Sequence, residues 1–544
     1  MKTKHSLLTA LVLSIATLAG AAEAGSLPHL EKKGTATQLV VDGQPFLMLG
    51  GELHNSSSSS LAYMKPIWPV LQSMHLNAVL APVSWELIEP REGQFDFSVV
   101  DGLIQGARSH DLHLVLLWFG TWKNSMSCYV PEWVKTDSRR FPRAEDRNGV
   151  PQEILSPFSA ENLRADARAF AALMVHVRKV DGNEHTVIMV QVENEIGMIP
   201  DARDHSATAN DHYRGPVPEA LMDYLAAHES TLNPGLREAW DRAGHKKSGT
   251  WEDVFGASIR SEEIFMAWYY ARYTDAVAAA GKAEYPIPMY VNTALSRPNT
   301  LPGQYPSAGP LPHLMDVWRA GAPSIDWLSP DIYFPNFAEW CDKYHRAGNP
   351  LFIPEMRPVV ANLFYALGQY DAMGVSPFGI EDCGGAAQPG EPASVGQSYR
   401  VLSELSPMIL AHQGSGSTVG VWLDDEHRTQ TVKLGNYTFT FAHEYTWPYS
   451  AGFNKPAPWP RVGGLMIMLS PDEFVLAGTG LVVTFKSDLP GKPSAGIVRI
   501  DEGSFENGKW TPRRRLNGDE DHQGRHLLLP SGQAGIQWLK LYSY

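Results

Sequence analysis

The stretch VIMVQVENEIG, residues 187–197, decides the fold of this chain. Its first six residues are apolar apart from Gln191, which is the pattern of a strand buried on both faces. Glu193, Asn194 and Glu195 follow directly. Burying a carboxylate costs free energy unless the charge is paired, so carboxylates at the end of a buried apolar strand are expected to have a partner or a function. The stretch therefore predicts a buried parallel strand that ends in a functional site.

Seven further apolar segments with the pattern of buried strands lie on either side of this one. Helical patterns, such as the amphipathic run at 161–180, separate them. Strand and helix alternating over about 370 residues are typical of a (β/α)8 TIM barrel, of class α/β. A doubly wound open sheet is the alternative, but it normally carries a glycine-rich phosphate-binding turn, and none follows a predicted strand here. The eight predicted strands lie in FLMLGGELHN (46–55), NAVLAPVSW (77–85), HLVLLWFG (113–120), VIMVQVENE (187–195), IPMYVNTA (287–294), IDWLSPDIYF (325–334), LFIPEM (351–356) and GVSPFGI (374–380).

The chain of 544 residues is expected to divide into three parts. Residues 1–24 have a basic start, a short apolar run and the A-x-A pattern of a cleavage site, which predict a signal peptide and an exported protein, periplasmic or secreted. Residues 25–413 are predicted to form the barrel, with an N-terminal hairpin and a long excursion at 200–285. Residues 414–544 alternate in short strands and predict a β-rich C-terminal domain of sandwich type.

Composition excludes several classes of function. The net charge is −14 and no basic tract is present, which argues against nucleic acid as a partner. The apolar run near the start is too short for a membrane span. No H-x-H or H-E-x-x-H spacing supports a metallohydrolase, so neither a metal nor another cofactor is expected. The three cysteines, Cys128, Cys341 and Cys383, allow at most one disulfide, and the oligomeric state is left open.

Polar side chains gather at the carboxyl ends of the predicted strands, which is where a barrel carries its active site. Two carboxylates on different strands, flanked by aromatic rings and amides, suit glycoside cleavage. One acid protonates the leaving oxygen, and the other attacks the sugar carbon or activates water. The strand ends contribute Glu52, His54, Asn55, Trp85, Glu86, Glu89, Trp118, Trp122, Lys123, Asn124, Glu193, Asn194, Glu195, Asp331, Tyr333, Glu355 and Glu381.

Three of these segments resemble glycoside hydrolase family 35, the β-galactosidases of the large retaining barrel clan. VQVENEIG (190–197) resembles the acid/base motif, which implies Glu195 as the acid/base. LFIPEM (351–356) resembles the nucleophile strand, which implies Glu355. NAVLAPVSWELIEPREGQFDFS (77–98) resembles the segment around the family's second strand. The resemblance implies a retaining enzyme that removes terminal β-galactosyl residues from oligosaccharides, and we expect plant cell-wall side chains of the xyloglucan type among its substrates.

The sequence also departs from that family. The third strand continues as WKNSMS (122–127), where the animal-type enzymes carry a Cys-Ala-Glu sugar contact, and the excursion at 200–285 is similar to family 42 β-galactosidases. Other readings therefore stay open: a family 42-like β-galactosidase, a β-glucosidase of the same retaining clan, or a non-catalytic carbohydrate-binding barrel.

Five further residues are predicted to bind the sugar. Asn194 is expected to hold the 2-hydroxyl, and Tyr333 to donate to the nucleophile. Asn124 and Glu381 are candidates for the axial 4-hydroxyl that distinguishes galactose from glucose, because a site that bonds a hydroxyl rejects the epimer lacking it. Trp118 is expected to offer an aromatic face.

Glu193 and Glu195 compete for the acid/base role, since residues two apart face the same side of a regular strand. Position near the strand end and the preceding Asn194 favour Glu195, and Glu193 is predicted to be structural. The mechanism requires a protonated Glu195 and an ionised Glu355 at rest. Arg357 is a second candidate donor to Glu355.

Overall fold

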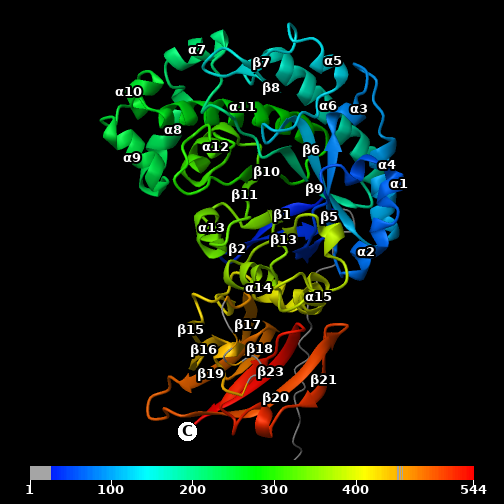
Figure 1. The fold of residues 1–544 in the computed structure, drawn as a ribbon, viewed down its shortest axis with the longest axis vertical. Coiled ribbons are helices and arrows are strands. Elements are labelled where there is room, and N and C mark those ends of the chain that lie inside the picture. Colours follow the sequence, from blue (N-terminus) through cyan, green and yellow to red (C-terminus); the bar gives the residue numbers. More distant parts are fainter. Residues whose placement is uncertain (1–25, 450–452, 454, 456–457) are drawn as a thin grey trace, which may run out of the picture.

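The computed structural model describes residues 26–449, 453, 455 and 458–544. The signal peptide expected at 1–24 lies outside these residues. The chain folds into an α/β barrel with a β-rich domain stacked against it along the long axis of the molecule (Figure 1). None of the described helices is long and apolar enough to cross a membrane.

Eight parallel strands form the barrel. Their order is β11-β10-β9-β6-β5 in one sheet and β12-β13-β4 in the other. Bridges from Glu52 to Leu80 and from Ile332 to Met356 join the two sheets, so the barrel closes. One strand falls in each predicted segment, which confirms the TIM barrel. The strands are β4 (Met48–Leu49), β5 (Ala78–Ser84), β6 (His113–Lys123), β9 (Val187–Asn194), β10 (Met289–Ala294), β11 (Trp327–Asp331), β12 (Phe352–Met356) and β13 (Gly374–Pro377).

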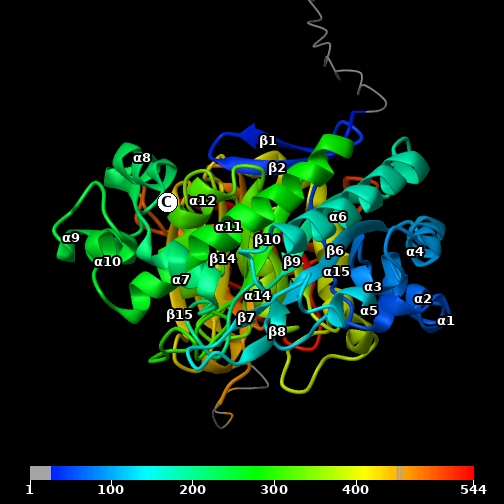
Figure 2. The same ribbon diagram turned by 90° about the horizontal axis from the view of Figure 1, so that it is seen from above.

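Helices follow the strands and cover the outside of the barrel. Local signals start them: Ser159 caps α6 through its side chain, and Ser394 and Gln397 form a capping box at the start of α15. Helices α6 and α11 lie side by side over β6 and β9 (Figure 2). Gly281 of α11 leaves room for the ring of Phe170 of α6. The covering helices are α2 (Ile67–Ser73), α4 (Ser98–Ser109), α6 (Ala160–Asp181), α11 (Ile259–Glu284), α12 (Met315–Gly321), α13 (Phe337–Tyr344), α14 (Val360–Gln369) and α15 (Val395–His412).

Two segments depart from this regular repeat. Between β9 and α11 the chain forms α7 (Ala207–Arg214), α8 (Glu219–Ala227), α9 (Pro234–Arg242) and α10 (Trp251–Phe255), where the long excursion is expected. Before β4, the strands β1 (His29–Lys33), β2 (Ala36–Val41) and β3 (Gln44–Phe46) form an antiparallel sheet. Leu39 and Val41 of β2 pack with Leu80 and Leu117, which point into the barrel, so this small sheet covers the interior at one end.

The C-terminal domain is a sandwich of two antiparallel sheets, as predicted. The sheets are β14-β17-β18-β23-β20-β21 and β15-β16-β19-β22. Val421, Phe474 and Leu539 of the first sheet share one core with Phe439 and Val483 of the second. The strands are β14 (Thr418–Leu423), β15 (Thr429–Leu434), β16 (Tyr437–His443), β17 (Val462–Ser470), β18 (Glu473–Thr479), β19 (Leu481–Ser487), β20 (Ala495–Glu506), β21 (Lys509–Arg515), β22 (His526–Leu529) and β23 (Gly535–Ser543).

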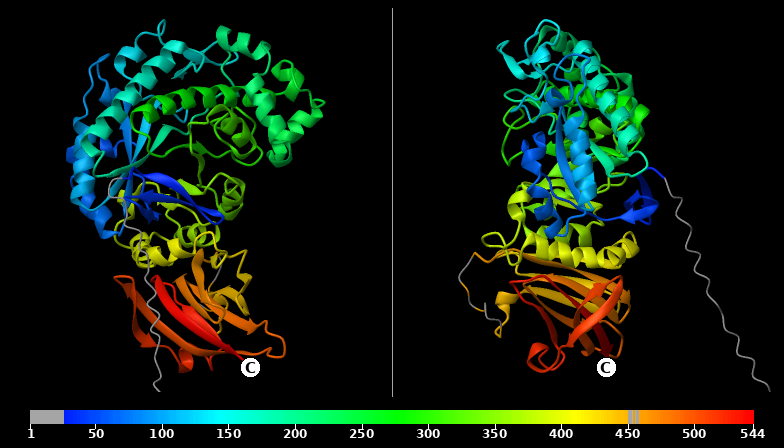
Figure 3. Two further views of the ribbon diagram at one scale, coloured as in Figure 1. Left: turned by 180° about the vertical axis from the view of Figure 1, so that it is seen from behind. Right: turned by 90° about the vertical axis from the view of Figure 1, so that its right-hand side faces the viewer.

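The sandwich packs directly on the barrel helices α14 and α15 (Figure 3). Gly368 of α14 meets Gly420 of β14 so closely that a Cβ on Gly368 would lie 3.0 Å from the Cα of Gly420. A Cβ on Gly463 of β17 would lie 2.8 Å from the Cα of Ala361. Leu465 belongs to the same buried cluster as the apolar side chains of the barrel helices. The two domains therefore share one close-packed apolar interface.

Candidate active site

Four carboxylates meet at the carboxyl end of the barrel, at the ends of β4, β9, β11 and β12. Glu195, Asp331 and Glu355 each offer one oxygen that lies within 4.8 Å of the other two. Glu52 completes the group and is 0% exposed. These four side chains and Lys123 at the end of β6 are named the inner cluster. One oxygen of Glu195 and one of Glu355 thus lie within 4.8 Å, a short spacing that agrees with the roughly 5 Å between the carboxyl groups of glycosidases that retain configuration.

Asn292 at the end of β10 ties the inner cluster together. Its Oδ1 accepts a hydrogen bond from the backbone N of Glu195 at 2.9 Å. Its Nδ2 donates to Asp331 at 2.8 Å and to Glu355 at 3.3 Å. Sequence reasoning missed this residue, although the segment 287–294 places an amide at the end of the fifth strand, where it would signal a site residue.

The side chain of Glu195 has two nitrogen neighbours. Asn124 Nδ2 donates to its Oε2 at 3.0 Å, and Lys123 Nζ lies 3.7 Å from the same oxygen. Lys123 is 4% exposed. Burial lowers the pKa of its ammonium group, but the surrounding carboxylates outweigh burial and the net pKa is raised. Lys123 therefore carries a positive charge inside the inner cluster.

Glu355 is held by the donor that the sequence predicts. Tyr333 Oη donates to its Oε2 at 2.7 Å. Burial, reinforced by the charge of Glu195, raises the pKa of Glu355 to about 7, while Lys123 and Tyr333 lower it. Arg357 does not reach Glu355, because its Nε donates to the backbone oxygen of Tyr333 at 3.0 Å. Arg357 therefore positions Tyr333.

The surroundings of Glu52 and Asp331 favour the neutral form of each carboxyl group. Burial, and then the charge of Glu355, raises the pKa of each well above its ordinary value. Neither oxygen of Glu52 has a hydrogen-bond partner among the described residues.

The other predicted sugar-binding residues fall into different places. Asn194 lies beside the inner cluster: its Oδ1 accepts from Gln191 Nε2 at 2.8 Å, and its buried Nδ2 has no partner within the described part of the chain. Glu381 accepts from the backbone N of His54 at 3.1 Å and from Ser57 Oγ at 2.6 Å. It therefore fastens the loop after β4 to the loop after β13.

The prediction that Trp118 contacts the sugar is wrong. Its ring is fully buried on the outer side of β6, packs on Phe170, and donates from Nε1 to Asp166 of α6 at 2.9 Å. Thr121 and Tyr273 also bond Asp166, at 2.5 and 3.2 Å. We name five residues the outer cluster: Trp118, Thr121, Asp166, Glu193 and Tyr273.

Glu193 and Glu195 point to opposite sides of the barrel wall. Glu193 has a φ of 60° and Glu195 a φ of 45°, left-handed values that break strand alternation. The Oε2 of Glu193 accepts from the backbone N of Trp122 at 2.8 Å. Burial, with Asp166 beside it, raises the pKa of Glu193 well above its ordinary value. Its environment is therefore structural, in line with the sequence prediction.

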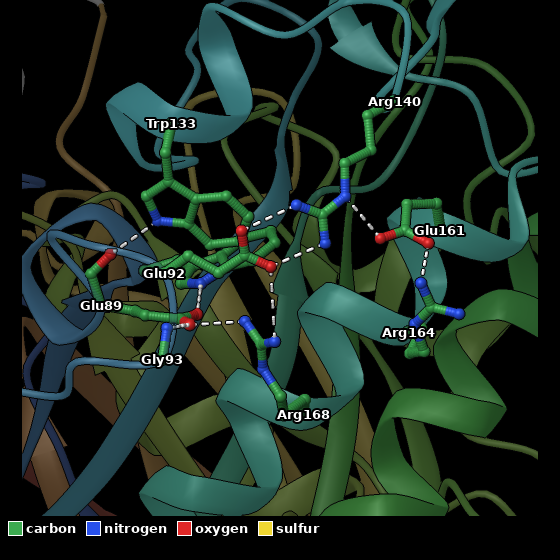
Figure 4. Close-up of polar contacts among 9 residues, drawn as sticks. Glu89, Glu92, Gly93, Trp133, Arg140, Glu161, Arg164 and Arg168 are labelled. Atoms are coloured by element: carbon green, nitrogen blue, oxygen red, sulfur yellow. Dashed lines mark hydrogen bonds and ion pairs between the residues drawn. The ribbon is translucent and has the colours of Figure 1, made fainter.

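The second-strand segment also holds a structural carboxylate. Glu89 is fully buried and accepts from Trp85 Nε1 at 2.9 Å. It also accepts from the backbone N of Gly93 at 2.6 Å and from Arg168 of α6 (Figure 4). Beside it, Arg140 grips both oxygens of Glu92. This segment fastens the loop after β5 to helix α6 and does not enter the inner cluster.

Comparison with known proteins bears on part of this geometry. Residues 63–255 match the family model of glycoside hydrolase family 42, described as "Beta-galactosidase". Residues 395–528 match a model described as a domain of unknown function, DUF5597. A curated "Beta-galactosidase" from Xanthomonas manihotis is 31% identical over 207 residues, which make up 37% of this chain. The chain spans only 31% of the length of that relative.

Solved structures of β-galactosidases are similar at low identity. One from Bacillus circulans sp. alkalophilus has a TM-score of 0.43 at 16% identity, over 67% of this chain and 57% of that one. A family 42 β-galactosidase from G. stearothermophilus has a TM-score of 0.49 at 10% identity, over 91% of this chain and 98% of that one. Superpositions this loose assign no activity.

The family match covers β5, β6 and β9, and so includes Glu195 but not Glu355. It supports a relation to the family 42 β-galactosidases, which the excursion at 200–285 also resembles. The finer assignment to family 35, made from short motifs, is not what this match supports.

Proposed function

We propose that this protein is a retaining β-galactosidase, closer to family 42 than to family 35, with Glu195 as the acid/base and Glu355 as the nucleophile. One observation carries the proposal: oxygens of these two buried glutamates lie within 4.8 Å at the carboxyl end of a closed barrel. Inverting enzymes need a wider gap, because a water molecule must fit between acid and sugar. The family match over 63–255 supports galactose as the sugar.

The reaction then proceeds by double displacement. The carboxylate of Glu355 attacks the anomeric carbon, while Glu195 gives its proton to the glycosidic oxygen and the bond to the leaving group breaks. In the second step Glu195 takes a proton from water, the water oxygen bonds the anomeric carbon, and the bond to Glu355 breaks. Galactose leaves with its configuration retained, and both glutamates return to their starting states.

The inner cluster supplies the charge balance for these steps. Burial raises the pKa of Glu52 and of Asp331, which favours their uncharged forms and limits the repulsion that they add when Glu355 ionises. Lys123, 3.7 Å from Glu195, stabilises the carboxylate that Glu195 becomes after it has given up its proton. Tyr333 and Asn292 hold the two oxygens of Glu355 for attack.

The substrate is a chain that ends in β-galactose. Asn194 Nδ2, buried without a protein partner among the described residues, is placed for the 2-hydroxyl. Asn124 and Lys123 are candidates for the remaining hydroxyls, since both lie against Glu195. Side chains of plant cell-wall xyloglucan are our candidate natural substrate. The reaction takes place outside the cytoplasm if residues 1–24 act as an export signal.

Activity profiling tests the proposal. The purified protein is given nitrophenyl β-galactoside, β-glucoside and α-arabinoside, and phenolate release is followed. We expect sustained release and a clear preference for the galactoside, unaffected by chelator. A preference for the glucoside would support a β-glucosidase of the same clan, and release from none of them would leave a carbohydrate-binding barrel.

A further inference from the structure

A large cleft lies between the barrel and the C-terminal sandwich. It has a volume of about 1330 Å³ and is bordered by the loops after β11 and β13 and by the sandwich strands β14 to β16. Helix α13 and strand β15, which flank it, lie on the same side of the molecule (Figure 1). We name this space the interdomain cleft. Its residues include Asn336, Tyr365, Trp422, Asp425, Glu426 and Trp459.

The interdomain cleft adjoins a smaller space near the nucleophile. A second cavity, of about 240 Å³, is lined by Tyr333 and Arg357. Pro335 and Arg461 line both cavities. Tyr333, which donates to Glu355, therefore borders the second cavity, and the second cavity shares two lining residues with the interdomain cleft.

The lining chemistry selects the ligand class. Aromatic rings from Trp422, Tyr445 and Trp459 lie beside carboxylates and amides that accept and donate hydrogen bonds. The carboxylates exclude a polyanion, and rings beside hydrogen-bonding groups suit a neutral, hydroxylated chain. The volume exceeds the roughly 300–1,000 Å³ of a common small-molecule site, so it accommodates several sugar units.

Two arginine side chains lie over the aromatic rings of the cleft, Arg461 over Trp422 and Arg428 over Trp459. The buried Nε of Arg461, at the junction of the two cavities, has no hydrogen-bond partner among the described residues. The guanidinium of Arg428 lies 4.0 Å from the ring centroid of Trp459 and holds that ring in place. A ring fixed in this way loses little freedom when a sugar stacks on it.

We propose that the interdomain cleft binds the leaving-group chain of a neutral galactosylated oligosaccharide, with the C-terminal sandwich supplying half of the binding surface. This inference rests on the proposed function, and it narrows the substrate from any terminal β-galactoside to an extended chain. Contacts far from the broken bond lower the barrier when they hold the substrate in its reactive position, so chain length affects turnover as well as affinity.

The experiment uses the full chain and one series of β-1,4-linked galactosyl oligosaccharides with two, three and four units. Trp459→Ala removes a stacking surface, and Glu426→Ala removes an exposed acceptor whose loss leaves the core untouched. Tyr542→Ala is the matched control, because Tyr542 is a 47% exposed aromatic residue of β23 outside the cleft lining. Each protein is also assayed on nitrophenyl β-galactoside, which has no leaving-group chain.

We expect the kcat/KM of the unaltered protein to rise about tenfold from the two-unit to the four-unit substrate, roughly one good aromatic contact. Trp459→Ala is expected to lose most of that rise and Glu426→Ala a part of it, with nitrophenyl galactoside turnover within about twofold of the unaltered protein. Tyr542→Ala should keep the full rise. Flat length dependence in the unaltered protein, or an equal loss on both substrate types, overturns the cleft assignment.

A binding measurement separates this inference from the proposed function. Tryptophan fluorescence is titrated with cello-oligosaccharides, neutral chains without galactose, and with a lysine-rich peptide. Saturable quenching by the sugars that Trp459→Ala abolishes supports the cleft, and quenching by the peptide alone refutes it. Failure to hydrolyse nitrophenyl galactoside, by contrast, defeats the proposed function whatever the fluorescence shows.

Discussion

Glu193 and Glu195 stand two residues apart on one strand, both buried, yet they serve different parts of the molecule. In the outer cluster, Asp166 beside Glu193 receives hydrogen bonds from Trp118, Thr121 and Tyr273. In the inner cluster, Glu195 faces a second carboxylate and the buried ammonium of Lys123. A buried acid alone therefore does not mark a catalytic site. Two facing acids with a buried cation beside them, at the carboxyl end of the barrel, do.

The largest effect is expected from Glu355→Gly, which removes the nucleophile of the inner cluster. We expect kcat to fall by about 10⁴-fold or more, as when other catalytic groups that act as a unit are deleted. Azide should restore part of the turnover of a dinitrophenyl galactoside by occupying the vacated space and attacking the anomeric carbon. Unchanged hydrolysis would refute the assignment.

The next effect separates the two glutamates of β9. Glu195→Ala should lower turnover of oligosaccharides by about 10²–10⁴-fold, because a poor leaving group needs its proton. A dinitrophenolate leaves unaided, so stopped-flow absorbance should show a burst followed by slow turnover. Glu193→Ala, the matched control, should show no burst and a lower unfolding temperature. The reverse pattern would exchange the two roles.

A smaller effect is expected from Lys123→Met in the inner cluster. Glu355 must be ionised to attack, so kcat/KM of the unaltered protein should fall as the pH drops below about 7. Because Lys123 lowers the pKa of Glu355, its loss should move this acid limb to higher pH. The pH profile is measured with nitrophenyl galactoside. Lys135→Met, which breaks a half-exposed pair with Glu86, should leave the limb in place.

The smallest effect concerns the stability contributed by the outer cluster. The pKa of Glu193 is raised in the folded chain, so its protonated form stabilises the fold below the ordinary glutamate range, and this contribution is lost as the pH rises. Glu193→Gln imitates the protonated form at every pH. The unfolding temperature of this variant should match that of the unaltered protein near pH 4 and exceed it at pH 8. The difference in the free energy of unfolding should grow by up to about 1.4 kcal/mol per pH unit. Parallel stability curves would contradict this account.

The regular part of the fold follows from sequence because apolar runs such as 114–119 and 187–190 leave few alternatives to buried parallel strands. The turn at Asp42-Gly43 is also predictable, because Asp-Gly is a common pair in hairpin turns whose two central residues have positive φ, as both residues do here. Glu195 and Glu355 are predictable since each directly ends such a run.

What sequence could not supply depends on which side of the wall a residue faces. Trp118 looks like a site residue from its place near a strand end, but it points outward to α6. The left-handed φ values of Glu193 and Glu195 leave no mark in the sequence, since glutamate is not a residue that favours them. The raised pKa values of Glu52 and Asp331 depend on burial in the closed barrel and on the charge of Glu355, which comes from another strand.

The glycine contacts at Gly368 and Gly420 have a consequence for how the two halves of the chain can be recombined. At this distance no larger side chain fits at either position. Any other domain packed against α14 would therefore also need a residue without a side chain at this contact. Cutting the chain after 413 would leave an apolar face of α14 bare to water. The barrel therefore depends on this sandwich to cover α14, and we expect that the sandwich cannot be removed or replaced without exposing apolar surface.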